Sequence, residues 1–165
     1  MTSNDLFASM PTALAAEIVE YAHANEKVLY RSALDAVAQA RKLRTVFLER
    51  QPKPERLAAV VESLSRPALS AAADTLLRAW LLKKHTALLI DFLDALGVKH
   101  EKGVVEDLPK SVEDAALKTA VDQLLAKHPQ PVVAIYLHAF NSMNAENWTN
   151  LEAMLYEDDR LELKK

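Results

Sequence analysis

Only two glycines occur in this chain, Gly97 and Gly103, and both lie in the short stretch GVKHEKG. Glycine adopts positive φ without steric cost, so the hairpin turns and bulges of a β-sheet normally use several of them. A chain this poor in glycine is badly suited to a many-stranded sheet. The sequence therefore predicts an all-α protein with one special connection near its middle.

Length and composition exclude several classes of protein. The chain has 165 residues, half of them hydrophobic, which is enough for a real core in one domain. Cysteine is absent, which excludes disulfides, thiolate metal sites and cysteine nucleophiles. The N-terminus resembles neither a signal peptide nor a membrane anchor, and charges interrupt every apolar stretch before it is long enough to span a bilayer. We therefore expect a soluble, cytoplasmic protein.

Prolines and apolar spacing predict six or seven helices. They are expected at residues 9–25, 26–50, 54–64, 68–96, 111–127 and 131–143, with a seventh beginning near Asn144. In the second, the apolar stripe runs as far as Leu43 and Phe47. The fourth is the most hydrophobic and contains no helix breaker, so it is expected to be a central helix surrounded by the others in an irregular bundle. Gly97 stands in a natural position to end it.

We expect a single helical domain over residues 1–165. If it divides, the sub-units expected are 1–97 and 111–165, joined by the 97–110 connection. Within that connection Gly103 suits the turn of a short β-hairpin near 98–105. The alternative is an extended surface connector, since an isolated two-stranded ribbon is marginally stable.

The charges are unevenly distributed around a net charge of −3. Residues 31–56 are rich in Arg and Lys, whereas the C-terminal stretch from Glu146 is acidic. Two interpretations stay open: both are solvated helix faces, or they complement each other across a contact between subunits. Nucleic-acid binding is disfavoured, because the whole chain is acidic and Arg44 is expected within the apolar arc of its helix, which divides the basic surface.

One polar constellation lies on the expected fourth helix. Helical spacing places Asp74, Arg78 and His85 on one sector, within an apolar face. Three interpretations follow: a solvated rim where the helix bends near His85, a buried structural network, or the lining of a ligand site. A ligand site would be completed by His138 or Asn141 from the expected sixth helix.

No motif specifies a metal, a cofactor or a catalytic mechanism. The Glu20-Tyr21-Ala22-His23 segment has the Glu-x-x-His spacing of di-iron bundles, but such a site needs a second copy and further glutamates. We therefore expect no cofactor, no metal and no catalytic residue.

The predicted function is that of a non-enzymatic helical interaction or scaffolding protein, with a protein partner or self-association as a two-fold homodimer. The alternative is a small-ligand-binding protein or enzyme whose internal site contains Asp74, Arg78 and His85. An exposed apolar patch would favour the first, and a concave pocket reaching those three side chains would favour the second.

Overall fold

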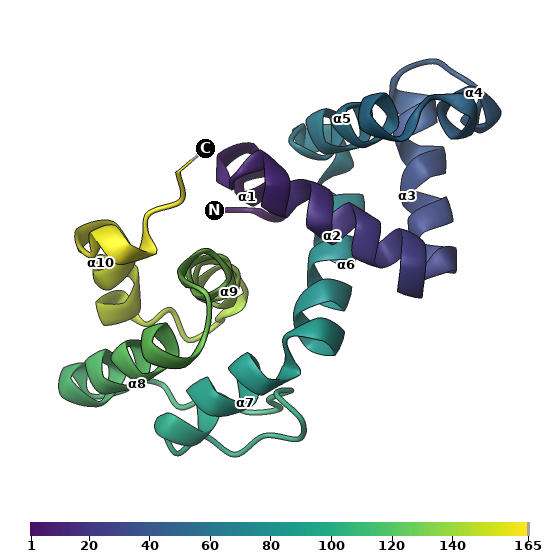
Figure 1. Cartoon of the computed structure of the whole chain (residues 1–165). Helices are drawn as coiled ribbons and strands as arrows, with labels where there is room; N and C mark the ends of the chain where they lie inside the picture. Colours follow the sequence, from purple (N-terminus) through teal and green to yellow (C-terminus); the bar gives the residue numbers. More distant parts are fainter. Residues whose placement is uncertain (165) are drawn as a thin grey trace. The chain divides into compact units, whose positions relative to one another are not determined.

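The computed structural model describes residues 1–164 and confirms the all-α prediction, with 74% of the chain in helices. These residues form no strand and ten α-helices, more than the six or seven expected. The helices are α1 (Ser3–Ser9), α2 (Thr12–Asn25), α3 (Lys27–Ala40), α4 (Thr45–Arg50), α5 (Lys53–Leu64), α6 (Ser70–Ala79), α7 (Thr86–Ala95), α8 (Asp114–Lys127), α9 (Gln130–Met143) and α10 (Thr149–Glu157). Figure 1 shows them in chain order from purple to yellow.

The chain divides into two compact units, Met1–Trp80 and Leu81–Leu163. Their boundary in the sequence lies inside the 68–96 segment and not in the 97–110 connection. The central helix expected there is wrong, because a π turn at Trp80–Lys84 separates α6 from α7. A π turn inserts one residue into the helical ladder and interrupts it without proline or glycine. The apolar surface of this segment is therefore shared between two cores.

In the first unit, α6 is the helix that α1, α2, α3 and α5 all contact. The side chains of Phe7, Ile18, Leu34 and Leu76 are buried in this core, as is the indole of Trp80. The indole N–H of Trp80 donates to the Glu17 carboxylate of α2, with 3.3 Å between Nε1 and Oε1. The polar atom of this large buried side chain is thereby satisfied.

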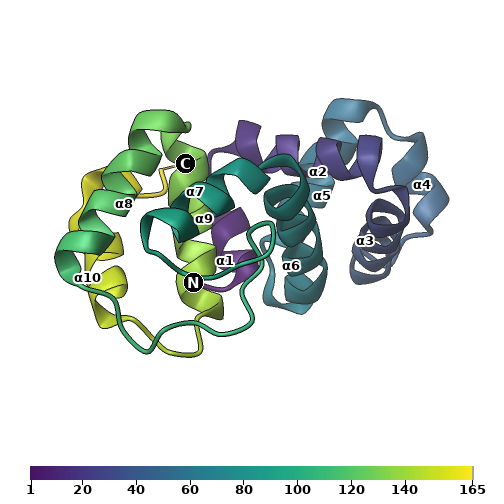
Figure 2. The ribbon, with the colours of Figure 1, turned by 90° about the horizontal axis from the view of Figure 1, so that it is seen from below.

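The helix expected at residues 26–50 is also wrong, because α3 ends at Ala40 and α4 begins at Thr45. The apolar stripe predicted along it does not continue inward, since Leu43 and Phe47 are exposed. In Figures 1 and 2, α4 lies at one end of the first unit, with α3 beside it.

The second unit packs α7 on α8, α8 on α9, and α9 on α10 and the following 3₁₀ turn Asp159–Leu161. Its core holds a chain of aromatic contacts in which Phe140 lies 5.3 Å, centroid to centroid, from both Phe92 and Trp148. The indole N–H of Trp148 donates to the carbonyl of Pro109, with an N–O distance of 2.8 Å. This hydrogen bond ties the long connection after α7 to the core.

The 97–110 connection contains one isolated antiparallel bridge, Glu101–Val104, in place of the hairpin considered at 98–105. Lys102 and Gly103 turn the chain with φ of +50° and +85°. Gly97, with φ of +67°, follows the end of α7. There the amide of Val98 donates to the carbonyl of Leu93, with an N–O distance of 2.9 Å. This is the glycine-dependent helix end that the sequence predicts.

Candidate functional site

The turn between α3 and α4 interrupts the helix predicted at residues 26–50, and Leu43 and Phe47 of its predicted apolar stripe are exposed. Lys42 has φ of +57°. The amide of Leu43 donates to the carbonyl of Ala38 and that of Lys42 to the carbonyl of Gln39, at N–O distances of 2.8 and 3.1 Å. This is a Schellman ending, in which the left-handed residue is normally glycine. A lysine here carries a conformational cost that glycine would avoid.

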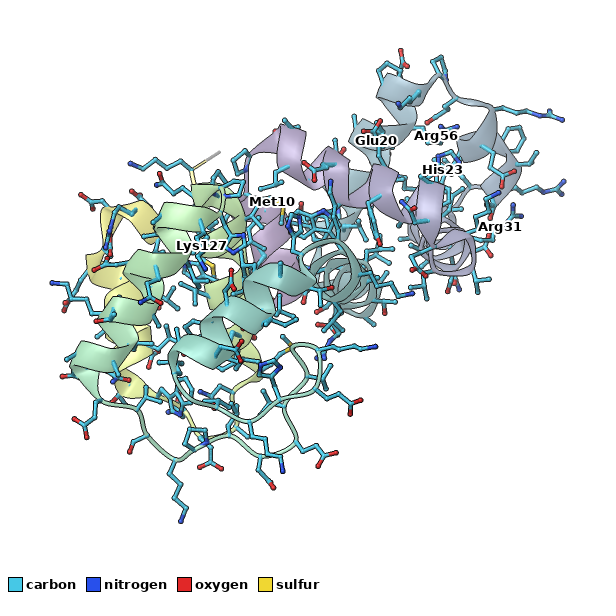
Figure 3. All side chains as sticks on the ribbon, turned by 60° about the horizontal axis from the view of Figure 1, so that its bottom comes forward. Met10, Glu20, His23, Arg31, Arg56 and Lys127 are labelled. Carbon is cyan, nitrogen blue, oxygen red and sulfur yellow. The ribbon has the colours of Figure 1, made fainter. Side chains whose placement is uncertain are left out.

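Three polar contacts reach α4 from α3 and α5, beside its buried residue Leu48. Arg31 of α3 pairs with Glu49 and also reaches Asp35, with 3.5 Å between Nε and Oδ1. The hydroxyl of Thr45 donates to Asp35 at 2.6 Å. From α5, the Arg56 guanidinium donates to the Glu49 carbonyl at 3.2 Å. Figure 3 labels Arg31 and Arg56. These contacts occupy the acidic groups nearest to α4.

Three apolar side chains face solvent here, one on the turn and two on α4. Leu43 is 42% exposed, Val46 39% and Phe47 54%. A phenylalanine exposed over half its surface leaves much of its large apolar area uncovered. Leu43, Val46 and Phe47 lie within five residues of one another in the chain, and we treat them together as one apolar cluster.

Cations surround that cluster. Lys42, Arg44 and Arg50 are exposed, and among residues 1–164 none of them has an ion-pair partner. The prediction that Arg44 divides the basic surface is wrong, because Arg44 is the N-cap of α4 and exposed. Arg41 instead folds back onto α5, where Nε donates to the Ser63 hydroxyl at 2.9 Å. We call Lys42, Leu43, Arg44, Val46, Phe47 and Arg50 the basic corner.

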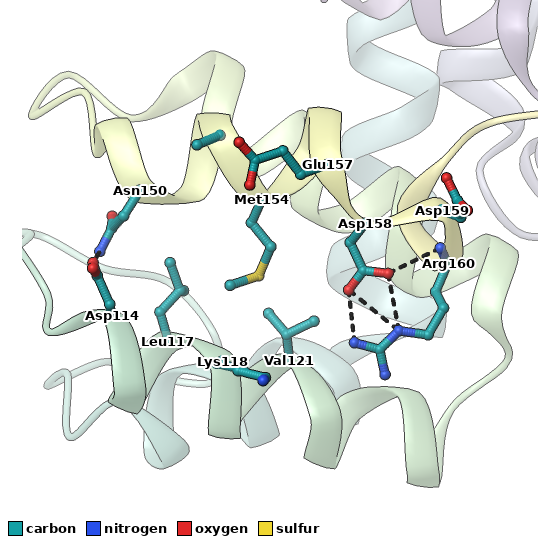
Figure 4. A pocket seen from close by; sticks show the side chains of 11 residues that line it. Asp114, Leu117, Lys118, Val121, Asn150, Met154, Glu157, Asp158, Asp159 and Arg160 are labelled. Atoms are coloured by element: carbon teal, nitrogen blue, oxygen red, sulfur yellow. Dashed lines mark hydrogen bonds and ion pairs between the residues drawn. The ribbon is translucent and has the colours of Figure 1, made fainter.

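A second feature lies in the second unit, where a groove of about 650 Å³ separates α8 from α10. Leu117 and Val121 of α8 and Met154 of α10 supply its apolar floor (Figure 4). Its rim is mostly acidic. The groove is lined by Asp114, Leu117, Lys118, Val121, Asn150, Ala153, Met154, Glu157, Asp158, Asp159 and Arg160. We call it the α8–α10 groove.

Local pairing determines which charges at the groove are available. The Arg160 guanidinium donates to Asp158 at 2.6 Å and to Asp122 at 2.9 Å. The hydrogen bonds from Arg160 hold the pKa of the Asp158 carboxyl below its ordinary value. Glu157 and Asp159 are exposed and have no ion pair within residues 1–164. The lining thus carries four carboxylates against two cations, Lys118 and Arg160, so the groove is net negative beside an apolar floor.

The polar constellation expected on one helix is divided by the π turn. Asp74 and Arg78 lie on α6 and pair at 2.7 Å, with side chains 39% and 51% exposed. The hydroxyl of Ser3 also donates to Asp74 at 2.9 Å. His85 follows the π turn and belongs to the second unit. Within the first unit, Asp74 and Arg78 form a half-exposed ion pair.

The two residues expected to complete a ligand site lie on α9. The Nε2–H of His138 donates to the carbonyl of Leu161, with an N–O distance of 3.1 Å. Burial lowers the pKa of His138, and the bond to Leu161 offsets part of that effect. The side-chain oxygen of Asn141 is buried and accepts no hydrogen bond from residues 1–164. His138 thus fastens the end of the chain to α9.

Other classes of site find no support in residues 1–164. No cluster of three or more His, Asp or Glu side chains there is arranged to hold a metal ion. None of the described helices has the length and apolar character that crossing a bilayer requires.

A further, mainly apolar groove of about 490 Å³ lies in the first unit, between the segment Phe7–Ala16 and α5.

The basic corner was partly accessible from the sequence. The cation-rich stretch 31–56 indicated its location, but the apparent continuation of the helix concealed the exposure of Phe47. The signal that could have found it is the run Arg41–Arg44, in which three of the four residues are basic and only Leu43 is apolar.

Comparison of the chain with models of protein families, with curated proteins and with solved structures gave no match.

Proposed function

We propose that this chain is a non-enzymatic, cytoplasmic protein-interaction module, and that its basic corner docks on acidic polypeptide surfaces with an apolar centre. The observation that carries the proposal is the exposure of Phe47, 54% accessible and flanked by exposed Arg44 and Arg50. Aromatic and arginine side chains are the groups most enriched where interfaces bind tightly. The apolar cluster would supply affinity, and the cations would supply orientation and faster association.

The way α4 is held supports this use. Arg31, Thr45 and Arg56 fix the helix through Asp35 and Glu49, so these acids do not neutralise Arg44 or Arg50. The corner is thus attached to α3 and α5 and stays positively charged. A pre-formed surface loses little conformational entropy on binding.

A defined probe tests the proposal. A fluorescein-labelled synthetic helical peptide of about 14 residues, with leucines on one face and glutamates on the other, is titrated with the full chain. We expect binding in the range of about 10–100 µM, measured by fluorescence anisotropy. Phe47→Ser should weaken binding by about tenfold, because truncation of an aromatic anchor typically costs over 1 kcal/mol.

The double variant Arg44→Glu/Arg50→Glu should bind no peptide, and a peptide with glutamine in place of glutamate should bind more weakly. Val28→Ser is the matched control, since Val28 lies on α3 and is 82% exposed outside the corner. Equal binding by wild type and Phe47→Ser contradicts the proposal. So does a corner that binds vesicles containing phosphatidylserine, or duplex DNA, but not the peptide.

A further inference from the structure

We propose that the partner of the basic corner is the α8–α10 groove of a second copy of this chain. This inference rests on the proposed function and names the surface that the corner recognises. Each copy carries both surfaces, one in each compact unit. Self-association therefore requires no other protein.

The apolar parts of the two surfaces match in chemistry. Leu43, Val46 and Phe47 stand out from the first unit at its α3–α4 turn. The floor of the groove is formed by Leu117, Val121 and Met154, and the groove offers about 650 Å³ of open space. Figure 4 shows the Met154 side chain pointing between the helices toward Leu117 and Val121. Methionine adapts its shape readily to an incoming aromatic ring.

The charges are complementary. The corner presents Lys42, Arg44 and Arg50. The groove is net negative: Glu157 and Asp159 have no ion pair in the described chain, and they outnumber Lys118, the unpaired cation of its lining. Docking would bring these opposite charges together at the edge of the apolar contact. Such pairs mainly determine the register of an interface and the rate of its formation.

Symmetry determines what assemblies follow. Because the corner and the groove are different surfaces, one contact leaves the second corner and the second groove unused. Both contacts are made at once in a two-fold dimer, and otherwise the copies add head to tail. Closed two-fold dimers are the commonest solution, so we expect a dimer of twice the 18.3 kDa chain mass.

Charge reversal on each surface separately gives the sharpest test. In the corner variant, Arg44→Glu and Arg50→Glu make the corner acidic. In the groove variant, Glu157→Lys and Asp159→Lys make the rim basic. By sedimentation equilibrium at about 5–200 µM, wild type should associate, and each variant alone should associate at least about tenfold more weakly.

An equimolar mixture of the two variants should associate again, because each altered surface then meets an opposite charge on the other chain. The matched control is Glu146→Lys/Glu152→Lys, which makes the same change of charge at exposed residues that do not line the groove. This control should associate like wild type. Circular dichroism of every variant confirms that the helices are retained.

Three results overturn the inference. In the first, the wild type stays at 18.3 kDa over the whole concentration range. In the second, both charge-reversal variants associate as strongly as wild type. In the third, the equimolar mixture of the two variants does not associate. If the acidic peptide still binds the basic corner in any of these cases, the proposed function stands and only the partner is wrong. If neither the peptide nor a second copy binds the corner, both proposals fail.

Discussion

At the scale of single residues, His138 makes the second unit sensitive to mild acid. Its imidazole is half-buried on α9 and donates to the Leu161 carbonyl. Burial lowers its pKa below the ordinary value of 6.5. As the pH falls through about 6.5, the unfolded chain takes up a proton that folded His138 still rejects. Stability is therefore complete above that pH and declines as the pH falls toward the folded pKa.

We expect His138→Gln to reduce the dependence of the free energy of unfolding on pH. Glutamine can keep a donor toward Leu161 and does not titrate, and the other histidines are common to both proteins. The measurement is urea unfolding, followed by circular dichroism, at about pH 7.5 and pH 5.5. Wild type should lose more stability than the variant between the two pH values. Equal losses would show that His138 titrates alike in the folded and unfolded chains.

At the scale of elements, the turn at Lys102–Gly103 packs closely against α7. A Cβ on Gly103 would lie 2.7 Å from the Cβ of Leu89, and the residue also has φ of +85°. Gly103→Ala should therefore combine backbone strain with a clash, and destabilise the chain by about 2–3 kcal/mol.

Gly97→Ala is the matched comparison for that variant. Gly97 has φ of +67° but no atom within 4 Å of the added Cβ, so it carries only the conformational cost of about 1 kcal/mol. Thermal unfolding of both variants measures the difference. If Gly103→Ala unfolds no earlier than Gly97→Ala, the turn does not pack on α7 as described.

The same elements show what the sequence could and could not predict. Scarce glycine predicted an all-α chain, and Gly97 predicted the end of α7, because glycine adopts positive φ without steric cost whereas other residues rarely do. The ends at Ala40 and at Trp80–Lys84 contain neither residue. Their residues are ordinary helix formers, so intrinsic propensity gives no warning of either break. Tertiary packing determines where these two helices end. The exposure of Phe47 follows from the first of these ends, at Ala40.

The basic corner, too, could be predicted from the sequence only in part. The excess of cations in residues 31–56 was visible in the sequence, because charge is a property of composition. The grouping of Leu43, Val46 and Phe47 outside the core was not, because it depends on a turn with Lys42 in a left-handed conformation. Asp74, Arg78 and His85 would share one face only if residues 68–96 formed one continuous helix, and the π turn at Trp80–Lys84 interrupts it.

At the scale of the whole molecule, the two compact units carry different surfaces, a basic corner in the first and an acidic groove in the second. If the two surfaces dock as proposed, we expect association of the chain to weaken as the ionic strength rises. Exposed charges are screened over a Debye length of about 10 Å at 0.1 M salt. The apolar cluster around Phe47 is expected to retain part of the affinity when salt is added.

The most direct test is hydrogen–deuterium exchange of the full chain at about 5 µM and about 500 µM. If the basic corner of one copy occupies the α8–α10 groove of another, exchange should slow with concentration in residues 41–50, and together with them in 114–121 and 149–160. Exchange that does not change with concentration, or that slows only along the apolar groove of the first unit at residues 54–65, would contradict docking through Phe47.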